Sequence, residues 1–466
     1  MITARAFDGK RYCVLGLARS GMAVAETLLA SGAQVTAWDR RDEPREALAG
    51  RATIADPLEI DLTGFDAIVV SPGVPLNTHP LTDKAKAAGV PIIGDIELFA
   101  LARSELPRHR VVGITGTNGK STTTALVHHL LVSAGMTARM GGNIGVPILA
   151  DEPLAEGGVY VLELSSYQID LTYSLDCDVA ALINITPDHL DRYDDFAAYA
   201  FAKGRLFAMQ SADYFAVFGC ADTPTSLIQQ AEDVRRAPGR AMCMSAEGLA
   251  EHQADWPSLQ GPHNLQNAAI AASLVQELGL SREQLLQGLA SFPGLPHRME
   301  RVATCNGMLF INDSKATNPA STAPALAAFP PENGGARIHW ICGGLAKEDN
   351  LDDCAPHFGN VAAAYTIGES GAMFADLLEP HMPVDRSEML VEAVLRAVDN
   401  AREGDVVMLS PACASFDQFR DYEVRGDTFR ELVAEMACGG DRARCGLDDL
   451  SPADGRPDHE AGRSAA

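Results

Sequence analysis

The chain alternates short apolar runs with longer segments of helical periodicity. Examples of the apolar runs are YCVLG at 12–16, VVGIT at 111–115 and IHWIC at 338–342. Parallel strands need long crossover connections, usually helices, so strands that alternate with helices are typical of parallel sheets. The pattern therefore predicts an α/β fold.

The 466 residues are too many for one ordinary domain and suit two or three. We predict a Rossmann-like N-terminal domain over 1–98, a central P-loop-type ATPase domain with a parallel sheet over 99–294, and a C-terminal Rossmann-like α/β domain over 295–438. The segment 439–466 has no aromatic residue and is rich in charge, glycine and proline. It cannot bury enough surface to offset its ordering entropy, so we predict a disordered tail.

The formal net charge of -25 argues against nucleic acid or an anionic membrane as the main partner. An anionic substrate would have to be met by cations gathered locally. The N-terminus lacks a signal-peptide pattern, and no apolar stretch approaches the roughly 18–20 residues that span a bilayer. We expect a cytoplasmic protein.

The ten cysteines are scattered along the chain and form no CxxC pair. Neither a zinc site nor a disulfide framework is indicated. We expect most of these cysteines to be small buried hydrophobic residues in a reducing compartment.

The stretch VVGITGTNGKST at 111–122 predicts a buried strand, a glycine turn and the start of a helix. This order directs backbone N–H groups toward an anion, and Lys120 adds a point charge for phosphate oxygens. Ser121 could place its hydroxyl on a magnesium ion. The Walker spacing is not met, because Ile114 stands where the first glycine should be. A βα turn with a chance lysine is the alternative, and the order of elements disfavours it.

Polar side chains follow the next two expected strands. Glu163 ends VYVLE at 159–163, and a carboxylate at the end of a parallel strand lies where α/β proteins bind ligands. His189 lies in NITPDHLDR, which follows the strand expected at 179–184. We expect Glu163 to hold a metal and His189 to contact a metal or phosphate. The alternatives are a surface glutamate and a structural histidine.

The first apolar run, with the segment that follows it, resembles a dinucleotide site only weakly. Asp39 closes the second expected strand, 23 residues beyond Gly16, but the glycines at 16 and 21 do not form GxGxxG. Ser71 lies on a loop after the third expected strand and faces the same edge.

Taken together, the motifs resemble the Mur ligase family, the enzymes that build the peptide stem of the bacterial cell-wall precursor. The resemblance covers nearly all of residues 10–437, and this family's loop carries GTNGK[ST] without the Walker spacing. The motifs that carry it are GITGTNGKST, GGNIG, LELSSYQ, NITPDHLDRY, GPHN, GLPHR, NDSKATN and LSPACASFDQF.

The combination of DSKATN, SPACASFDQF and GDIELF resembles the branch that adds D-glutamate to UDP-N-acetylmuramoyl-L-alanine. The resemblance implies that ATP phosphorylates the substrate carboxylate and that the amine of D-glutamate then attacks the acyl phosphate, in peptidoglycan synthesis. Another amino-acid-adding Mur enzyme, a folylpolyglutamate-type ligase and a non-catalytic nucleotide-binding protein are the alternatives. The reaction's partners are all anionic, so positioning and charge neutralisation should dominate catalysis.

The resemblance implies site residues at the matching positions. For catalysis these are Lys120, Glu163, His189 and Lys203, and for metal they are Ser121, Glu163, His189 and Lys203. For ATP they are Gly116, Thr117, Asn118, Gly119, Lys120, Ser121, Thr122, Asn267, Arg298 and Asp313. For the UDP-substrate they are Ala18, Arg19, Ser20, Asp39, Arg40, Ser71, Asn143 and Ser165. For D-glutamate they are Lys315, Thr317, Lys347, Ser415, Phe416 and Tyr422.

The cofactors implied are ATP, two Mg²⁺ ions and a carbamylated Lys203. From the residues alone, Lys203 would be an ordinary solvated lysine, and only the motif favours the modification. We expect a monomer that binds small-molecule substrates. The loops GTNGKST and DSKATN lie in different predicted domains, so we expect the third domain to close on the nucleotide.

Overall fold

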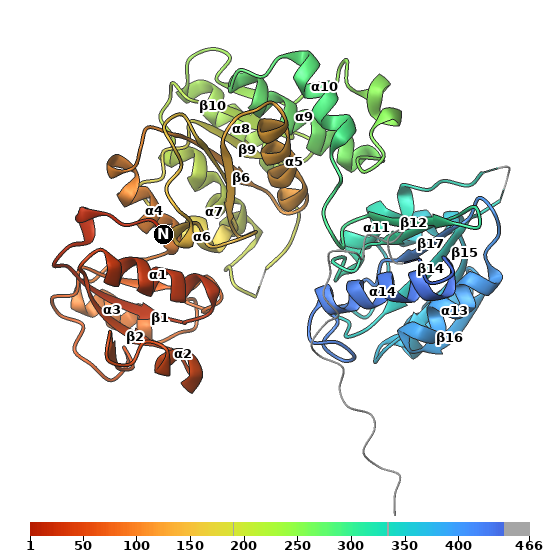
Figure 1. Ribbon diagram of the computed structural model, residues 1–466, viewed down its shortest axis with the longest axis horizontal. Helices are drawn as coiled ribbons and strands as arrows, with labels where there is room; N and C mark the ends of the chain where they lie inside the picture. The colour runs from red at the N-terminus through yellow and green to blue at the C-terminus, as the bar shows by residue number, and fades with distance from the viewer. Residues whose placement is uncertain (190, 333–334, 442–466) are drawn as a thin grey trace, which may run out of the picture. The chain divides into compact units, whose positions relative to one another are not determined.

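The computed structural model describes residues 1–189, 191–332 and 335–441. Within these ranges the chain forms three β-sheets flanked by helices (Figure 1). The chain divides into two compact units, Met1–Phe292 with two sheets and Pro293–Ala466 with one. The predicted α/β class is confirmed. The tail predicted from 439 falls almost entirely on 442–466, outside the described residues.

The N-terminal sheet has five parallel strands in the order β3-β2-β1-β4-β5. Its strands are β1 (Arg11–Leu15), β2 (Gln34–Trp38), β3 (Thr53–Ile54), β4 (Ala67–Val70) and β5 (Ile92–Ile93). The accompanying helices are α1 (Arg19–Ala30), α2 (Asp42–Glu46), α3 (Leu81–Ala88) and α4 (Asp95–Ala102), with 3-10 turns η1 (Arg5–Phe7) and η2 (Arg103–Glu105). The strand order reverses around β1, and the carboxyl end beside such a strand is the usual ligand site.

The central sheet has six parallel strands in the order β11-β10-β9-β6-β8-β7. Its strands are β6 (Arg110–Thr115), β7 (Ala138–Gly142), β8 (Val159–Glu163), β9 (Val179–Leu182), β10 (Phe215–Phe218) and β11 (Ala241–Cys243). Its helices are α5 (Lys120–Ser133), α6 (Ser166–Asp170), α7 (Phe196–Met209), α8 (Thr223–Arg235), α9 (Pro262–Glu277) and α10 (Arg282–Ser291), with η3 (Ile148–Ala150) and η4 (Ala250–Asp255). Strand β6 lies between β8 and β9, so the ends of these three strands are neighbours.

The C-terminal sheet has the order β12-β13-β17-β14-β15-β16, and only the β12–β13 pair is antiparallel among the strands that the structure describes. Its strands are β12 (Glu300–Cys305), β13 (Met308–Asn312), β14 (Ile338–Gly343), β15 (Val361–Ile367), β16 (Val384–Glu388) and β17 (Val406–Leu409). Its helices are α11 (Pro319–Ala327), α12 (Gly371–Leu378), α13 (Leu390–Asn400) and α14 (Tyr422–Met436), with η5 (Ala355–Asn360). Parallel alignment places the loops after β13, β14 and β17 at one edge.

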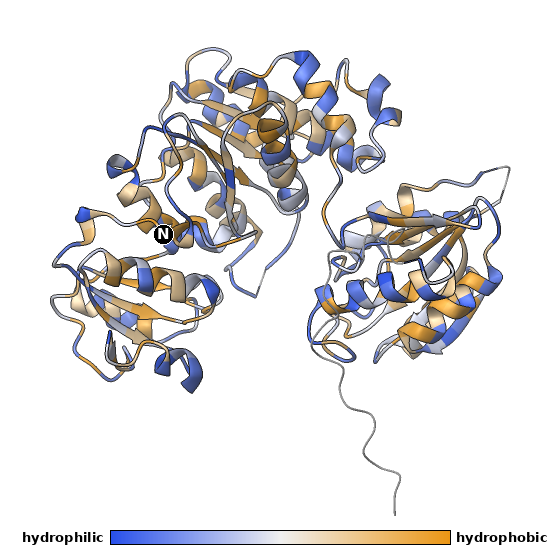
Figure 2. Cartoon of the chain, in the orientation of Figure 1, coloured by the Kyte–Doolittle hydropathy of each residue, from blue (hydrophilic) through white to orange (hydrophobic). Residues whose placement is uncertain are grey.

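The hydrophobic residues gather in the sheets. Figure 2 shows hydrophobic colour along the strands of all three sheets and hydrophilic colour on the outer sides of many helices. Every residue of β4, β8, β9 and β17 is buried, as expected for strands covered on both faces. The hydrophobic cores therefore hold the strands in place. The polar loops at the carboxyl ends of the strands are the candidate positions for functional residues.

Candidate active site

The glycine loop between β6 and α5 is held against the end of β9. The backbone N–H groups of Thr117 and Asn118 donate 2.8 Å hydrogen bonds to the backbone and side-chain oxygens of Asn184, respectively. Gly119 has a φ of 84°, and a Cβ atom there would lie 2.4 Å from Asn267 Oδ1. The loop therefore requires glycine at 119, and α9 packs directly against it through Asn267.

Two lysine side chains reach the same carbonyl oxygen in this loop. Lys120 Nζ donates to Gly116 O at 3.0 Å and to Thr117 O at 2.7 Å. Lys203 Nζ, from α7, donates to Gly116 O at 2.7 Å. Burial lowers the pKa of Lys203 well below its usual value, and repulsion from Lys120 lowers it further. The loop thus gathers cationic groups in an otherwise acidic chain.

Lys203 is not the solvated lysine that the residues alone suggest, because it is 1% exposed. Helix α7 begins after Asp195, whose side chain accepts the Ala198 N–H, and carries Lys203 inward two turns later. Its Nζ lies 4.6 Å from the ring centroid of Tyr199, and the Tyr199 hydroxyl shares a 3.1 Å hydrogen bond with Thr117 Oγ1. The expectation from the residues alone is therefore wrong, and the carbamylation that the resemblance implies stays a prediction.

Glu163 ends β8 as a buried carboxylate, 2% exposed. Its Oε1 accepts a 2.8 Å hydrogen bond from Asn143 Nδ2, whereas its Oε2 is buried and has no hydrogen-bond partner in the described part of the chain. A buried carboxylate oxygen without a partner is costly unless a cation meets it. The chemistry therefore fits a magnesium ion at Glu163.

The described residues hold no group of three or more histidine, cysteine, aspartate or glutamate side chains arranged for a metal.

His189 lies in the loop that follows β9, with a φ of 54°. Its ring centroid is 5.0 Å from that of Tyr167, and its Nε2 is 3.4 Å from Asp188 Oδ2. Burial lowers the pKa of His189, and the charges of Lys120 and Lys203 lower it further against the opposing effect of Asp188. A neutral imidazole beside these lysines is suited to ligate a metal or contact phosphate. Leu190 lies outside the described residues.

In the N-terminal sheet, Asp39 holds the loop after β1 through its carboxylate. Leu17 N donates to Asp39 Oδ2 at 2.7 Å, and Ser71 Oγ donates to Gly16 O at 2.8 Å. Residues 16–20, Asp39 and Ser71 thus meet at the carboxyl edge of the sheet. Of the other residues that the resemblance implied here, Ala18, Arg19 and Arg40 are exposed, and Ser20 is half-buried.

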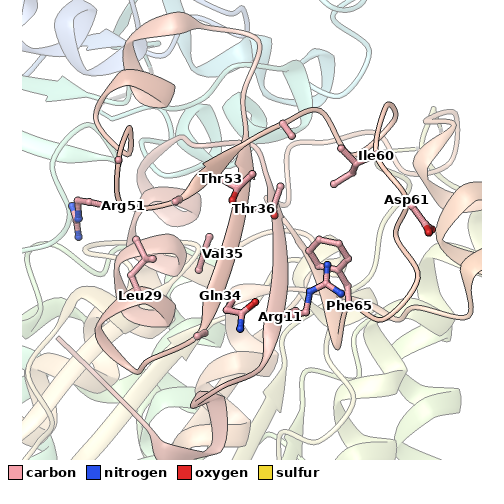
Figure 3. Close-up of a pocket in the computed structure, with 14 residues that line it drawn as sticks. Arg11, Leu29, Gln34, Val35, Thr36, Arg51, Thr53, Ile60, Asp61 and Phe65 are labelled. Carbon is pink, nitrogen blue, oxygen red and sulfur yellow. The ribbon is translucent and has the colours of Figure 1, made fainter.

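A separate cavity of about 720 Å³ lies in the N-terminal domain (Figure 3). Arg11 lies in it with its guanidinium carbon 4.5 Å from the ring centroid of Phe65. None of the residues expected to contact the UDP-substrate lines this cavity. Its walls are formed by Arg11, Leu29, Ala33, Gln34, Val35, Thr36, Gly50, Arg51, Ala52, Thr53, Ala55, Ile60, Asp61 and Phe65.

In the C-terminal unit, Asp313 follows β13 and is 6% exposed. Ser410 Oγ donates to its Oδ2 at 2.7 Å, and Met299 N donates to its Oδ1 at 3.0 Å. Burial raises the pKa of Asp313 to about 7. Both oxygens already accept protein hydrogen bonds, so the ribose contact that the resemblance implied stays a prediction.

The residues expected to bind D-glutamate lie on the loops after β13, β14 and β17 and at the start of α14. Lys315 Nζ is 3.7 Å from the ring centroid of Tyr422. Ser415 is buried, Thr317 is half-buried, Lys347 is exposed, and Phe416 is 70% exposed. The exposed aromatic ring and lysine are available to a ligand.

Sequence reasoning missed Arg425, which is 1% exposed in α14. Its guanidinium donates to Ser314 Oγ at 3.0 Å, Ser314 O at 2.8 Å, Cys413 O at 3.0 Å and Ala414 O at 3.3 Å. It thereby joins the DSKATN loop to the SPACAS loop. A signal was present, because 425 shares a helical face with the apolar positions 429 and 433.

The cysteine prediction is partly wrong. Cys220 pairs with Cys243, and Cys305 pairs with Cys438, as disulfides. The remaining cysteines of the described residues are buried thiols, as expected: Cys13, Cys177, Cys342, Cys354 and Cys413. The pairing was missed because partners 23 and 133 residues apart leave no local pattern.

Among the residues described, no helix is both long and apolar enough to cross a membrane.

The chain has three β-sheets flanked by helices, and a glycine loop joins a strand of the central sheet to a helix. Comparison with family models identifies the class of protein that has this architecture. The N-terminal domain of MurD-like Mur ligases matches residues 10–94, the Mur ligase middle domain 114–254, and the Mur ligase glutamate ligase domain 297–413. The chain belongs to the Mur ligase family.

Within that family, its relatives include proteins named UDP-N-acetylmuramoylalanine–D-glutamate ligase. The protein from Novosphingobium aromaticivorans is 67% identical over 94% of this chain and 97% of its own length. The one from Sphingopyxis alaskensis is 58% identical over 94% of this chain and 100% of its own length. The one from Zymomonas mobilis is 51% identical, with the same coverage of both chains.

Solved structures share the fold at low sequence identity. MurF ligase from Thermotoga maritima, in complex with ADP, is 15% identical with a TM-score of 0.58, covering 92% of this chain and 95% of its own. The UDP-N-acetylmuramate–alanine ligase MurC from Thermotoga maritima is 18% identical with a TM-score of 0.55, covering 91% and 99%.

Proposed function

We propose that this chain is an ATP-dependent ligase that joins D-glutamate to UDP-N-acetylmuramoyl-L-alanine in peptidoglycan synthesis. Its near full-length similarity to proteins named for this reaction supports the substrates. The observation that carries the chemistry is the unpartnered, buried Oε2 of Glu163 in the same central domain as the glycine loop, in which Lys120 and Lys203 share Gly116 O. This arrangement suits a metal-assisted transfer of phosphate.

The glycine loop holds the triphosphate. The start of α5 offers backbone N–H groups and the helix dipole to phosphate oxygens, and Lys120 neutralises their charge. The resemblance extends this set to residues 116–122 with Asn267, Arg298 and Asp313. Glu163 and Ser121 would hold a magnesium ion, which would polarise the phosphoryl oxygens, and Asn143 fixes the Glu163 carboxylate for that task.

The acyl phosphate would form beside Lys203 and His189. The lowered pKa of Lys203 keeps part of its amine neutral. Only a neutral amine reacts with carbon dioxide to form a carbamate. The carbamate anion and a neutral His189 would be suitable ligands for a second magnesium ion. Burial of Lys203 supports this modification.

The UDP-substrate binds mainly at the N-terminal sheet, and D-glutamate binds at the C-terminal sheet. The UDP-substrate contacts Ala18, Arg19, Ser20, Asp39, Arg40 and Ser71 in the N-terminal domain, with Asn143 and Ser165 in the central one. D-glutamate binds at Lys315, Thr317, Lys347, Ser415, Phe416 and Tyr422, where a lysine ammonium suits its side-chain carboxylate. Arg425 fixes the two loops that carry Lys315 and Ser415.

The remaining parts of the proposal concern the whole chain. We place the domain limits at 98/99, 294/295 and 438/439. The protein is a monomer and is cytoplasmic in this proposal. Light scattering in line with size-exclusion chromatography tests the monomer, and a dimer mass would refute it.

Amino-acid-dependent phosphate release from ATP tests the function. The acceptor is UDP-N-acetylmuramoyl-L-alanine, offered with D-glutamate, L-glutamate, L-alanine or meso-diaminopimelate. We expect release with D-glutamate alone. Lys120→Ala should abolish it, whereas Lys86→Ala, at an exposed lysine of α3, should not. Phosphate release with a different amino acid would refute D-glutamate as the substrate. No phosphate release with any of these amino acids would refute the proposed ligase reaction.

A further inference from the structure

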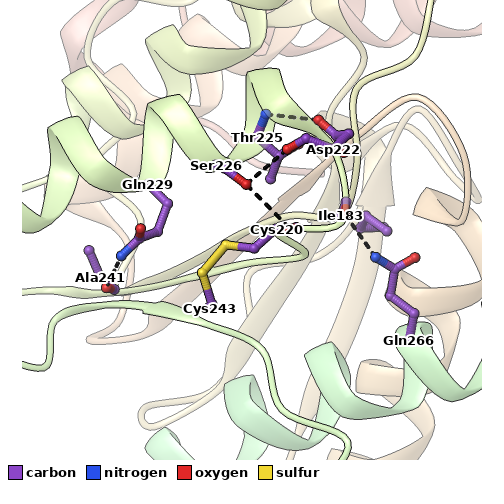
Figure 4. The surroundings of a disulfide bond; sticks show 9 residues. All are labelled: Ile183, Cys220, Asp222, Thr225, Ser226, Gln229, Ala241, Cys243 and Gln266. Atoms are coloured by element: carbon purple, nitrogen blue, oxygen red, sulfur yellow. Dashed lines mark hydrogen bonds between the residues drawn. A yellow bond between two sulfur atoms is a disulfide. The ribbon is translucent and has the colours of Figure 1, made fainter.

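The Cys220–Cys243 disulfide joins the turn after β10 to the edge strand β11. The two Cα atoms are 5.7 Å apart, and Cys243 is exposed at the end of that edge strand (Figure 4). The other disulfide differs, because Cys305 is 1% and Cys438 is 7% exposed. A reductant in solution therefore reaches Cys243 far more easily than the second pair.

A short hydrogen-bonded path leads from Cys220 to the loop after β9. Ser226 Oγ donates to Cys220 O at 3.2 Å and to Asp222 O at 2.9 Å (Figure 4). The Asp222 side chain caps α8 by accepting Thr225 N at 2.8 Å, and its second oxygen accepts Ile185 N at 3.1 Å. Asp222 thus ties the cysteine turn to residue 185.

The same path continues into the glycine loop. Asn184, beside Ile185, accepts the N–H groups of Thr117 and Asn118, and Thr186 N donates to Thr117 Oγ1 at 3.0 Å. The contact between the turn and β9 is also tight, since a Cβ on Gly219 would lie 1.8 Å from Ile183 O. Because these contacts are close and continuous, we expect a displacement of the cysteine turn to displace the glycine loop as well.

We propose that the Cys220–Cys243 disulfide is a redox-sensitive brace that holds the nucleotide loop in its binding shape. Cys220 has a φ of 49°, in the left-handed region that non-glycine residues rarely adopt. Such a conformation persists only while its surroundings enforce it, and the bond to Cys243 is one of those constraints. Breaking the bond lets Cys220 relax and weakens the hold of Asp222 on Ile185. The inference rests on the proposed use of this loop for ATP.

The chemical step is thiol–disulfide exchange with a dithiol reductant. A thiolate of the reductant attacks the exposed Cys243 sulfur, the S–S bond breaks, and Cys220 leaves as a thiolate that takes up a proton. The second thiol of the reductant resolves the mixed disulfide. Two electrons and two protons pass to the protein, and the reductant becomes a disulfide. Disulfides in reducing compartments are rare and are usually catalytic or redox-sensing.

The test compares the oxidised full-length chain with the chain treated with dithiothreitol, after mass spectrometry has counted its thiols. We expect the reduced chain to bind ADP about tenfold more weakly by calorimetry, a change of about 1.4 kcal/mol. We also expect faster hydrogen exchange at the amides of Thr117, Asn118 and Ile185 without nucleotide. Unchanged exchange and affinity after reduction at 220 and 243 would overturn the brace.

Three variants sharpen the comparison. Cys243→Ser should behave as the reduced chain and ignore dithiothreitol, whereas Cys305→Ser with Cys438→Ser should keep the response. Asp222→Asn retains a good N-cap but weakens the acceptor for Ile185, so it should lower ADP affinity in the oxidised state with little change in Tm. A response that persists in Cys243→Ser would refute the assignment. Failure of the oxidised chain to bind ADP would refute the proposed function, while the exchange rates would still decide the brace.

Discussion

Replacing Arg425 with methionine should separate the architecture of the proposed D-glutamate site from its chemistry. The guanidinium makes four hydrogen bonds, but Ala414 O also accepts from Leu345 N at 2.9 Å, and Ser314 Oγ still donates to Tyr422 O at 2.8 Å. The carbonyl oxygens of Ser314 and Cys413 lose their donor. Each unsatisfied buried acceptor costs about 1–3 kcal/mol, so the loss is about 2–6 kcal/mol.

Part of that loss is recovered, because methionine need not carry a charge into the interior. Taking a guanidinium charge out of water is unfavourable, and the same burial lowers the pKa of Arg425 to about 10. We therefore expect a net loss of about 2–3 kcal/mol in the unfolding free energy of the second unit. For a unit of this size that is a fall in Tm of roughly 4–12 °C.

The kinetic assay is phosphate release with D-glutamate varied at saturating ATP and UDP-substrate. We expect the KM for D-glutamate to rise at least about tenfold, because the DSKATN and SPACAS loops lose their shared anchor. The KM for ATP in the same variant should change far less. Arg396→Met is the control, since that side chain is 42% exposed and its ion pair with Asp385 lies at the surface. An unchanged Tm together with an unchanged KM for D-glutamate would refute the reasoning.

Three further predictions concern single groups of the site. Glu163→Gln should lower turnover at least about a hundredfold and abolish the response to added magnesium, while Tm holds or rises because the removed buried carboxylate has one oxygen without a partner among the described residues. Full turnover would count against a metal there. Lys203→Met should lower turnover and remove the carbamate signal that ¹³C-bicarbonate gives in the NMR spectrum of the wild-type chain; no such signal in the active wild-type chain would exclude the modification. Burial raises the pKa of Asp313 from an unfolded value near 4 to about 7, so the folded state holds the extra proton and stability should fall as pH rises from about 4 to about 7. Asp313→Asn should flatten that part of the stability curve in urea unfolding, and an unaltered slope would contradict a buried titrating carboxyl.

The strands of the fold were predictable because their buried residues form continuous apolar runs. The expected runs at 12–16, 111–115 and 338–342 fall on β1, β6 and β14 within a residue of their ends. The loops at the ends of these strands followed from the same reasoning, because parallel strands bring their carboxyl ends to one edge. The position of Glu163 next to the glycine loop could therefore be predicted from the sequence alone.

Contacts that join distant elements were not predictable from the residues. Lys203 sits mid-helix in a run of alanine and phenylalanine, and only the fold of α7 onto the loop shows that its amine is buried. The Cys220–Cys243 pair depends on β10 and β11 being neighbours, which is a property of sheet order. Arg425 was missed because an arginine in a helix is ordinarily solvated.

The carbonyl oxygen of Gly116, which both lysines contact, leads to a prediction about the order of the proposed carbamylation and nucleotide binding. Both lysine side chains donate to this one oxygen, and the charge of Lys120 adds to the effect of burial in lowering the pKa of Lys203. A bound triphosphate would screen Lys120 and relax that repulsion, making the Lys203 proton harder to remove. If Lys203 is carbamylated as proposed, its amine should react with carbon dioxide more readily in the empty enzyme than after the nucleotide has bound.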